Sequence, residues 1–121
     1  MNTRNGLSRR SFIASSSVAT AAVLTAPHVY AQSKEFRIAQ IGCGGKGASD
    51  LGSITRGGAK VVALCDVDPA KAKKTYNKYP DLPKYTDFRK MLAEQAKNID
   101  GVVVSTPDHT HAVAVLDAIS R

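Results

Sequence analysis

Short runs of apolar residues alternate with longer amphipathic stretches along the chain from Phe36 onward. The apolar runs indicate buried strands, and the stretches whose apolar positions recur every three or four residues indicate helices. The predicted strands are residues 36–41, 60–65, 84–86 and 102–105. The predicted helices are residues 45–56, 69–78, 87–97 and a last one that begins at 108. This alternation predicts an α/β fold, in which helices cover both faces of a parallel sheet.

Residues that favour helix ends stand at the predicted boundaries. Gly57 and Gly58 follow the first helix, and Pro69 opens the second, at a position where a missing amide hydrogen costs nothing. Asp87 and Asp108 are predicted to cap the third and fourth helices. The apolar residues expected on the face of the last helix that packs on the sheet are Ala112, Val115, Leu116 and Ile119.

The predicted sheet of about four strands is incomplete. A doubly wound sheet of six strands needs a second half, and this chain supplies little more than the first. We therefore interpret residues 32–121 as a truncated domain that lacks its substrate domain. An incomplete sheet exposes a strand edge and apolar surface that the second half should cover.

The first 31 residues resemble an export signal. Arg9 and Arg10 directly precede an apolar run at residues 14–24 that serine and threonine dilute, as in a bacterial twin-arginine signal. Small residues before position 32 suit a signal peptidase, so the mature protein is expected to begin near Gln32, to be periplasmic or otherwise exported, and to have no membrane anchor. The alternative is a flexible tail with a chance arginine pair.

The basic charge of the chain lies partly in this signal. Arg4, Arg9 and Arg10 belong to it, with none of the 10 acidic residues, so its removal lowers the formal net charge from +7 to +4. The other basic residues are interleaved with acids, without the aromatic platforms or clustered arginines that a nucleic-acid surface would need. We therefore expect no nucleic-acid partner.

A glycine-rich turn follows the first predicted strand and opens the first helix. Residues 42–47 fit the pattern G-x-G-x-x-G, in which Gly42 permits a tight turn, Gly44 a close approach to a pyrophosphate and Gly47 close packing of helix on strand. Gly45 lies inside the same loop. Unpaired amides at the helix N-terminus would bind the diphosphate, which indicates a Rossmann-type dinucleotide site. A phosphate-loop NTPase is excluded because Gly47 follows Lys46 where serine or threonine should hold magnesium.

Asp66 adds specificity to this motif. It ends the second strand, 19 residues after Gly47, where an acid would accept hydrogen bonds from the adenosine ribose. A carboxylate there repels a 2′-phosphate, so NAD is favoured, and nearby Lys71 keeps NADP as an alternative. The competing interpretation is a glycine turn with an unrelated acid.

The segment after the fourth strand, residues 106–111, should lie at the same edge of the sheet. Thr106, Pro107 and His109 are predicted to contact the cofactor. His109 and His111 with no third ligand make a poor zinc site, so no metal is predicted. The plainer alternative is a helix cap beside two solvated histidines.

The two cysteines and the lysines of the second helix receive structural interpretations. Cys43 and Cys65 end neighbouring strands and are predicted to be buried thiols, because a protein folded in the cytoplasm is exported reduced. The lysines expected on a solvated helix face are Lys71, Lys73, Lys74 and Lys78.

Three motifs together resemble the Gfo/Idh/MocA family, which includes glucose-fructose oxidoreductase and inositol dehydrogenase. They are residues 42–47, the Ala-Leu-Cys-Asp-Val-Asp-Pro run at 63–69 and the Val-Val-Ser-Thr-Pro-Asp-His-Thr-His run at 103–111. The likeness extends from about residue 36 to 119. Several members of this family carry twin-arginine signals.

The resemblance implies a tightly held nicotinamide cofactor and hydride transfer to or from a sugar or polyol. The family's catalytic lysine belongs to a Glu-Lys-Pro motif beyond Arg121, so no catalytic residue is assigned, and this chain alone is expected to be inactive. The alternatives are an NAD-dependent glycoside hydrolase of the same superfamily and a non-catalytic nucleotide-binding fragment. A homo-oligomeric parent protein is left open.

Overall fold

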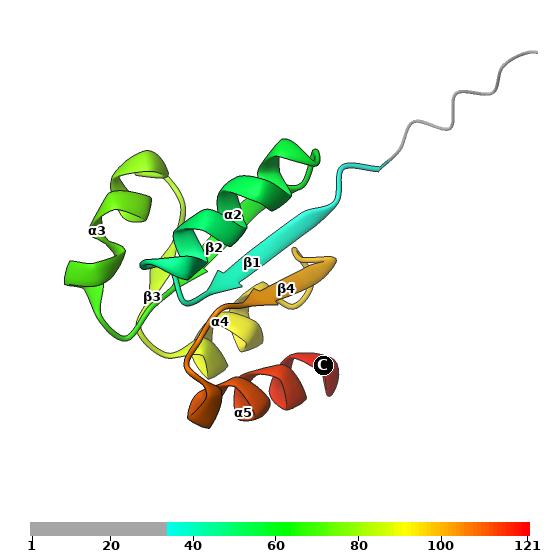
Figure 1. Cartoon of the computed structure of the whole chain (residues 1–121). Coiled ribbons are helices and arrows are strands. Elements are labelled where there is room, and N and C mark those ends of the chain that lie inside the picture. Colours follow the sequence, from blue (N-terminus) through cyan, green and yellow to red (C-terminus); the bar gives the residue numbers. More distant parts are fainter. Residues whose placement is uncertain (1–33) are drawn as a thin grey trace, which may run out of the picture. The chain divides into compact units, whose positions relative to one another are not determined.

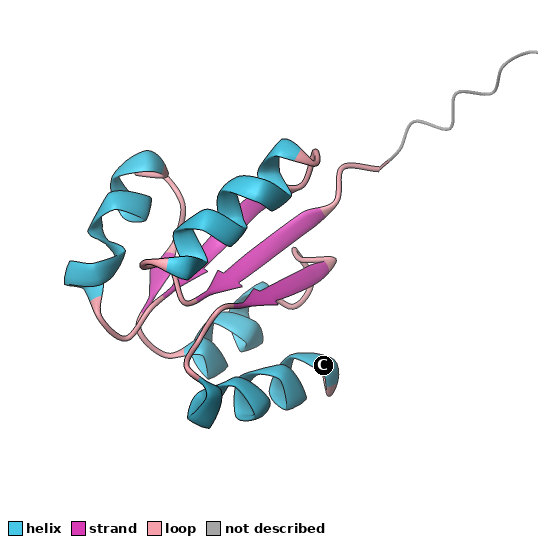
Figure 2. Ribbon diagram, viewed as in Figure 1, coloured by secondary structure: helices cyan, strands magenta, loops and turns pink. Residues whose placement is uncertain are grey.

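A computed structural model of the chain describes residues 34–121, in which strands and helices alternate (Figures 1 and 2). The predicted signal segment lies outside the described residues. The elements in chain order are β1 (Arg37–Ile41), α2 (Lys46–Arg56), β2 (Lys60–Cys65), α3 (Pro69–Lys78), β3 (Lys84–Tyr85), α4 (Phe88–Gln95), β4 (Gly101–Val104) and α5 (Asp108–Ile119).

The four strands form a parallel sheet with the order β3-β2-β1-β4. Chain connections run outward from β1 to β2 and β3, and then return across the sheet to β4 on the other side of β1. Parallel neighbours of this kind need helical crossovers, which α2, α3 and α4 supply. The order matches the first four strands of a doubly wound nucleotide-binding sheet, so the predicted α/β class is confirmed.

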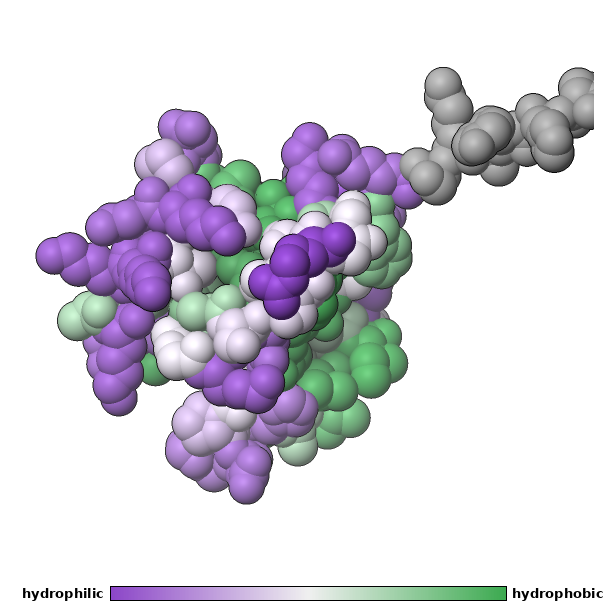
Figure 3. All heavy atoms as spheres, turned by 45° about the horizontal axis from the view of Figure 1, so that its top comes forward, coloured by the Kyte–Doolittle hydropathy of each residue, from purple (hydrophilic) through white to green (hydrophobic). Residues whose placement is uncertain are grey.

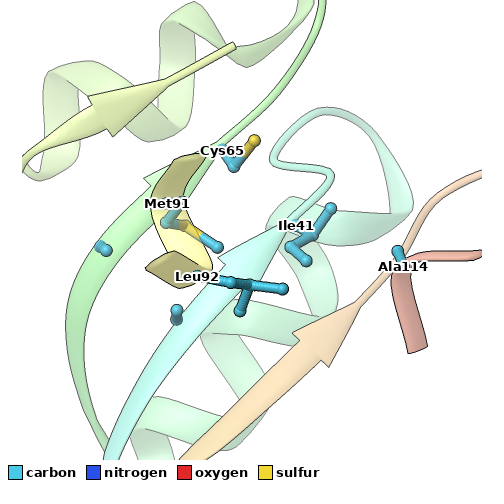
Figure 4. Close-up of a cluster of buried hydrophobic side chains, with 7 residues drawn as sticks. Ile41, Cys65, Met91, Leu92 and Ala114 are labelled. Carbon is cyan, nitrogen blue, oxygen red and sulfur yellow. The ribbon is translucent and has the colours of Figure 1, made fainter. Parts of the chain in front are cut away.

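Two apolar cores lie on opposite faces of the sheet. On one face Leu51 of α2 and Ala72 of α3 pack against Ile38 and Leu64. The other core contains Met91 and Leu92 of α4, Ala114 of α5, and Ile41 and Cys65 from the strands; Figure 4 shows these side chains meeting. Helices therefore cover both faces, as the sequence predicts.

A β-bulge in β2 allows both faces to be filled. Ile38 pairs with Val61 but Ala39 pairs with Ala63, so Val62 is the extra residue opposite β1. Without the bulge, Val61 and Leu64 would face opposite sides, because side chains alternate along a strand. With it, both belong to the core beneath α2 and α3.

The last helix packs differently from the prediction. Ala114 is buried and Ala118 packs against the core, whereas Leu116 is 68% and Ile119 is 76% exposed and Ala112 is also exposed. The predicted face, apart from the half-buried Val115, was therefore wrong. Apolar residues lie all round this helix, and in that case periodicity alone does not select the packed face.

Two further boundaries are corrected. Asp108 is the first residue of α5 and makes no side-chain cap, because Pro107 occupies the cap position. Strand β4 begins at Gly101 and ends before Ser105, one residue earlier than predicted. The predicted helix start at Pro69 and the predicted cap at Asp87 are confirmed, and the Asp87 carboxylate accepts a hydrogen bond from the amide of Arg89.

Surface polarity differs between the two sides of the sheet. Lys71, Lys73, Lys74 and Lys78 are all exposed on α3, as predicted. Apolar surface gathers instead on the side where β4, an edge strand, and the C-terminal end of α5 lie (Figure 3). Within residues 34–121, no helix is long and apolar enough to cross a membrane.

Candidate functional site

The carboxyl ends of β1, β2 and β4 meet at one edge of the sheet. Gly42 follows β1, Asp66 follows β2 and Ser105 follows β4, and all three strands are parallel neighbours. The chain leaves β1 toward β2 but reaches β4 on the opposite side, so the edge between β1 and β4 is the point at which the strand order reverses. Open α/β sheets bind ligands in the crevice at such a point.

A cavity of about 740 Å³ opens at this edge. Its volume is in the range of sites for small organic ligands. The predicted site residues that line it are Gly42, Gly44, Gly45, Asp66, Thr106, Pro107 and His109. Gly47 does not line the cavity, and its contribution is to packing.

Close backbone contacts explain three of the glycines. Gly42 has φ +84°, and a Cβ there would lie 2.6 Å from the carbonyl oxygen of Ser105. A Cβ on Gly47 would lie only 2.0 Å from the carbonyl oxygen of Gly42. Gly44 has a reason that the sequence did not reveal, since its Cβ would lie 3.0 Å from the backbone of Lys71 at the start of α3. The turn and the helix-to-strand contact thus both require glycine.

The N-terminus of α2 has no side-chain cap. Gly45 occupies the cap position, and the first turn contains no acidic residue. In contrast, the first amides of α3 already bind the carboxylate of Asp68. The amide of Gly47 donates to the carbonyl oxygen of Gly44 at 2.9 Å. The other first amides and the positive dipole end of α2 are therefore available to an anion in the cavity.

Asp66 joins the second strand to the glycine loop. Its Oδ2 accepts hydrogen bonds from the amides of Cys43 at 2.7 Å and Gly44 at 3.2 Å, and its Oδ1 accepts one from the amide of Asp68 at 2.8 Å. A carboxylate has about four acceptor positions, so one is left for a ligand hydroxyl. Asp66 is thus both a component of the loop and a candidate ligand contact.

Residues outside the fingerprint also hold this loop. The Gln40 Nε2 donates to the carbonyl oxygen of Gly42 at 2.8 Å and to Ser105 Oγ at 3.2 Å, and Ser105 Oγ donates to Asp50 Oδ2 at 2.8 Å. A hydrogen bond from Lys46, assisted by the one from Ser105, lowers the pKa of Asp50 below its ordinary value of 3.8. Sequence reasoning missed this network. The overlooked signal was Gln40, a polar residue between two buried apolar residues of β1.

The opposite wall of the cavity begins after β4. The Thr106 Oγ1 is buried and has no hydrogen-bond partner among the described residues. His109 and His111 line the cavity and are exposed. The part of the chain that the structure describes contains no cluster of three potential metal ligands, so the histidines have no third ligand nearby. This wall offers hydroxyl and imidazole groups to a ligand.

The two cysteines are buried behind the loop. Both are free thiols, as predicted, and Cys43 Sγ donates to the carbonyl oxygen of Cys65 at 3.4 Å. Burial raises the pKa of each thiol to about 12. Since a protonated thiol is a poor nucleophile, neither cysteine is a candidate for covalent chemistry near neutral pH.

Comparison with known families agrees with this geometry. A family model described as an oxidoreductase family with an NAD-binding Rossmann fold, named for Gfo, Idh and MocA, matches residues 36–121. The chain belongs to the Gfo/Idh/MocA family. Its predicted Rossmann-type fold and its assignment to an NAD-binding family are thereby confirmed.

Curated relatives and a solved structure lie in the same group. The chain is 36% identical over 125 residues to a glycosyl hydrolase family 109 protein of Stenotrophomonas maltophilia, covering 93% of this chain and 27% of that protein. It is 38% identical over 89 residues to an inositol 2-dehydrogenase of Burkholderia multivorans, covering 71% of this chain and 26% of that enzyme. Scyllo-inositol dehydrogenase from Lactobacillus casei, solved with NAD(H) and scyllo-inositol, superimposes with a TM-score of 0.61 at 25% identity, covering 72% of this chain and 26% of that one. This Gfo/Idh/MocA chain thus spans about a quarter of the length of each relative.

Proposed function

We propose that this chain is the NAD-binding N-terminal part of an exported oxidoreductase that acts on sugar-like or polyol-like substrates. The observation that carries the proposal is the cavity where the strand order reverses, which combines the uncapped N-terminus of α2 with Asp66. An anion site beside a carboxylate fits the diphosphate and ribose of a dinucleotide. NAD, when bound, accepts or supplies the hydride, and the residues of this chain bind and orient it.

Each part of the cavity suits one part of NAD. The amides at the start of α2 would bind the diphosphate, and Asp66 would accept a hydrogen bond from the adenosine ribose. Thr106, Pro107 and His109 would lie along the nicotinamide half, where the Thr106 hydroxyl has no partner within the described residues. The chemistry of the lining therefore fits the cofactor without assigning a catalytic residue to this chain.

The charges beside Asp66 support NAD over NADP. Asp68 also lines the cavity, and its Oδ1 accepts hydrogen bonds from the amides of Ala70 at 3.1 Å and Lys71 at 3.2 Å. The N-terminus of α3 is thus occupied by a carboxylate and is closed to a 2′-phosphate. Lys71 is exposed and lies 3.8 Å from Asp68, so its charge is partly balanced.

The test of cofactor choice compares Asp66→Asn with Asp87→Asn in the complete protein. Both changes keep an amide oxygen that can accept hydrogen bonds, but Asp87 caps α4 and does not line the cavity. Asp66→Asn should weaken NAD binding by about tenfold, because a hydrogen bond to a charged acceptor is replaced by a neutral one, and should weaken NADP binding less. Calorimetric titration measures both affinities. Equal losses for NAD and NADP, or the same effect from Asp87→Asn, would refute the role of Asp66.

The substrate class follows from the relatives. The inositol 2-dehydrogenase of Burkholderia multivorans and the Lactobacillus casei scyllo-inositol dehydrogenase both act on a cyclic polyol. Because the chain spans about a quarter of their length, we assign substrate binding and the catalytic groups to the rest of the complete protein. Reduction of NAD by the complete protein in the presence of a panel of cyclitols and sugars tests this assignment, and no reduction with any of them counts against it.

A glycoside hydrolase is the second candidate. The alignment with the glycosyl hydrolase family 109 protein covers 93% of the chain, more than residues 34–121 can supply, whereas the inositol 2-dehydrogenase alignment covers 71%. The likeness to that hydrolase therefore reaches into the N-terminal segment. A hydrolase that uses bound NAD transiently would cleave a glycoside without net accumulation of NADH, and the oxidoreductase would accumulate it. Measuring sugar release and NADH in one reaction separates the two.

We assign residues 1–31 to a twin-arginine export signal on the basis of Arg9 and Arg10 and the apolar run that follows. The twin-arginine pathway exports proteins that have already folded. Such a protein can bind NAD in the cytoplasm before it is exported. Replacing Arg9 and Arg10 with lysine should retain the protein in the cytoplasmic fraction, while Arg4→Lys in the same segment should not. Unchanged export of the double variant would indicate another route.

A further inference from the structure

Two consecutive peptide groups of the glycine loop are bonded at both ends by side chains. In the Gly42–Cys43 peptide, the carbonyl oxygen accepts from Gln40 Nε2 at 2.8 Å and the amide donates to Asp66 Oδ2 at 2.7 Å. In the Cys43–Gly44 peptide, the carbonyl oxygen accepts from Thr75 Oγ1 at 2.6 Å and the amide donates to Asp66 Oδ2 at 3.2 Å. Rotation of either peptide would break bonds on both sides.

Gln40 and Thr75 stand out by their burial. Among residues 34–121 they are the only polar residues that are buried as a whole, with 0% and 5% exposure. They come from β1 and α3, and neither lines the cavity that contains the loop. The two polar residues of the described unit that are buried as a whole therefore both bind carbonyl oxygens of one loop.

An apolar residue at either position would avoid a desolvation cost. Gln40 retains a buried Oε1 that has no partner in the described part of the chain, which makes it a poor choice for stability alone. Ile38, two residues earlier on the same strand, packs on the same face as an ordinary apolar core residue. The contact with the loop is what distinguishes position 40.

The orientation of these peptides decides what the loop presents to an anion. Carbonyl oxygens that faced a diphosphate would repel it, whereas amide hydrogens attract it. The carbonyl oxygens of Gly42 and Cys43 are bonded within the protein instead, and the amides of the same two peptides donate to Asp66. The anion is thus left to the first turn of α2, which the loop positions. A loop that is held in one conformation before the ligand binds loses less freedom on binding, and affinity rises when that ordering cost is removed in advance.

We propose that Gln40 and Thr75 are positioning residues for the dinucleotide, and that together with Asp66 they hold the glycine loop in the conformation that receives the diphosphate. The inference rests on the proposed NAD site. It assigns a role in cofactor affinity to two residues outside the glycine fingerprint, one of them 32 positions away from the cysteine whose carbonyl it binds.

The decisive variants are Thr75→Val and Thr75→Ser, with Thr55→Val as a matched control. The Thr55 hydroxyl also donates to a backbone carbonyl, that of Leu51 at 2.9 Å, but within α2 and away from the loop. In the complete protein, Thr75→Val should weaken NAD and ADP-ribose binding by about tenfold, the scale of one buried acceptor left without its partner. Thr75→Ser, which keeps the hydroxyl, should restore most of the affinity, and Thr55→Val should leave the affinity for NAD unchanged.

Binding of AMP, as a second ligand, distinguishes a role of Thr75 in positioning the glycine loop from a general loss of protein stability. AMP lacks the diphosphate linkage, so Thr75→Val should weaken its binding less than that of ADP-ribose. If Thr75→Val binds NAD as tightly as Thr55→Val, or loses AMP and ADP-ribose affinity equally, the positioning role is wrong and the NAD site stands. If the unmodified protein binds no NAD, the proposed function itself fails.

Hydrogen exchange tests the same point without any substitution. In the ligand-free complete protein, the amides of Cys43 and Gly44 should exchange slowly, because both donate to Asp66. Exchange at the rate of an open loop would overturn the proposal even if the Thr75 variants did not fold.

Discussion

Gly47→Ala is the substitution for which the structure gives the sharpest expectation. The added Cβ would lie 2.0 Å from the carbonyl oxygen of Gly42 and 2.7 Å from its carbonyl carbon. Both neighbours are backbone atoms, and that carbonyl oxygen is itself bonded to Gln40. Relief of the clash therefore requires either the first turn of α2 to move away from β1 or the glycine loop to open.

Gly47→Ala changes the free energy of unfolding through two effects, helix propensity and overpacking, which have opposite signs and unequal sizes. Alanine in place of glycine inside a helix favours folding by at most about 1 kcal/mol. Overpacking against atoms that cannot rotate away costs about 1–3 kcal/mol and sometimes more, and here the contact falls about 1.4 Å short of an ordinary one. We expect Gly47→Ala to lower the free energy of unfolding by about 2 kcal/mol or more, and to weaken NAD binding because the loop is displaced.

Gly52→Ala provides the matched control in the same helix. Its Cβ would meet only the end of the Arg56 side chain, at 3.6 Å. The gain in helix propensity is then not opposed by a clash, and the free energy of unfolding should rise by up to about 1 kcal/mol. Urea unfolding followed by circular dichroism measures both variants, and calorimetry measures their affinity for NAD. If Gly47→Ala were as stable as the unmodified protein, or if Gly52→Ala were equally harmful, the packing argument would be refuted.

Two further predictions concern titratable groups. Because hydrogen bonds from Lys46 and Ser105 depress the pKa of Asp50, its stabilising effect is present above the ordinary value of 3.8 and is lost as the pH falls through the lower folded-state pKa. Asp50→Asn should therefore lower the urea midpoint at neutral pH but not in strong acid, and an equal difference at both pH values would contradict this reasoning. Since burial raises the pKa of the Cys43 and Cys65 thiols to about 12, neither should react with a thiol reagent in the folded protein at neutral pH. Both should react after denaturation, and fast labelling of the native protein would show that the thiols are accessible.

Local signals in the sequence were sufficient to predict most of the helices and strands. Pro69 and Asp87 mark helix starts through backbone chemistry that acts within a few residues, and the structure has α3 and α4 begin where they indicate. The run of apolar residues at 60–65 coincides with β2. The glycine pattern likewise predicted a tight turn at Gly42, because the positive φ is a property of that single residue.

The face of α5 and the cap of that helix were not predictable in this way. Leu116 and Ile119 are as apolar as core residues, yet they are exposed, because the sheet contacts the helix at Ala114 and Ala118. Asp108 has a residue type that favours a cap, but Pro107 occupies that position.

The sequence by itself determined the order of the elements, the glycine turn and the acid at the end of β2, since each is encoded by residues close together in the chain. Only the tertiary structure revealed the β-bulge at Val62, the close approach of Gly44 to the backbone of Lys71, and the bonds from Gln40 and Thr75 that hold the loop. Thr75 and Cys43 are 32 residues apart, and Gln40 and Ser105 are 65 apart. Such pairs meet only after three strands and their crossover helices have packed, because the register of the sheet, rather than any local propensity, sets the distance between them.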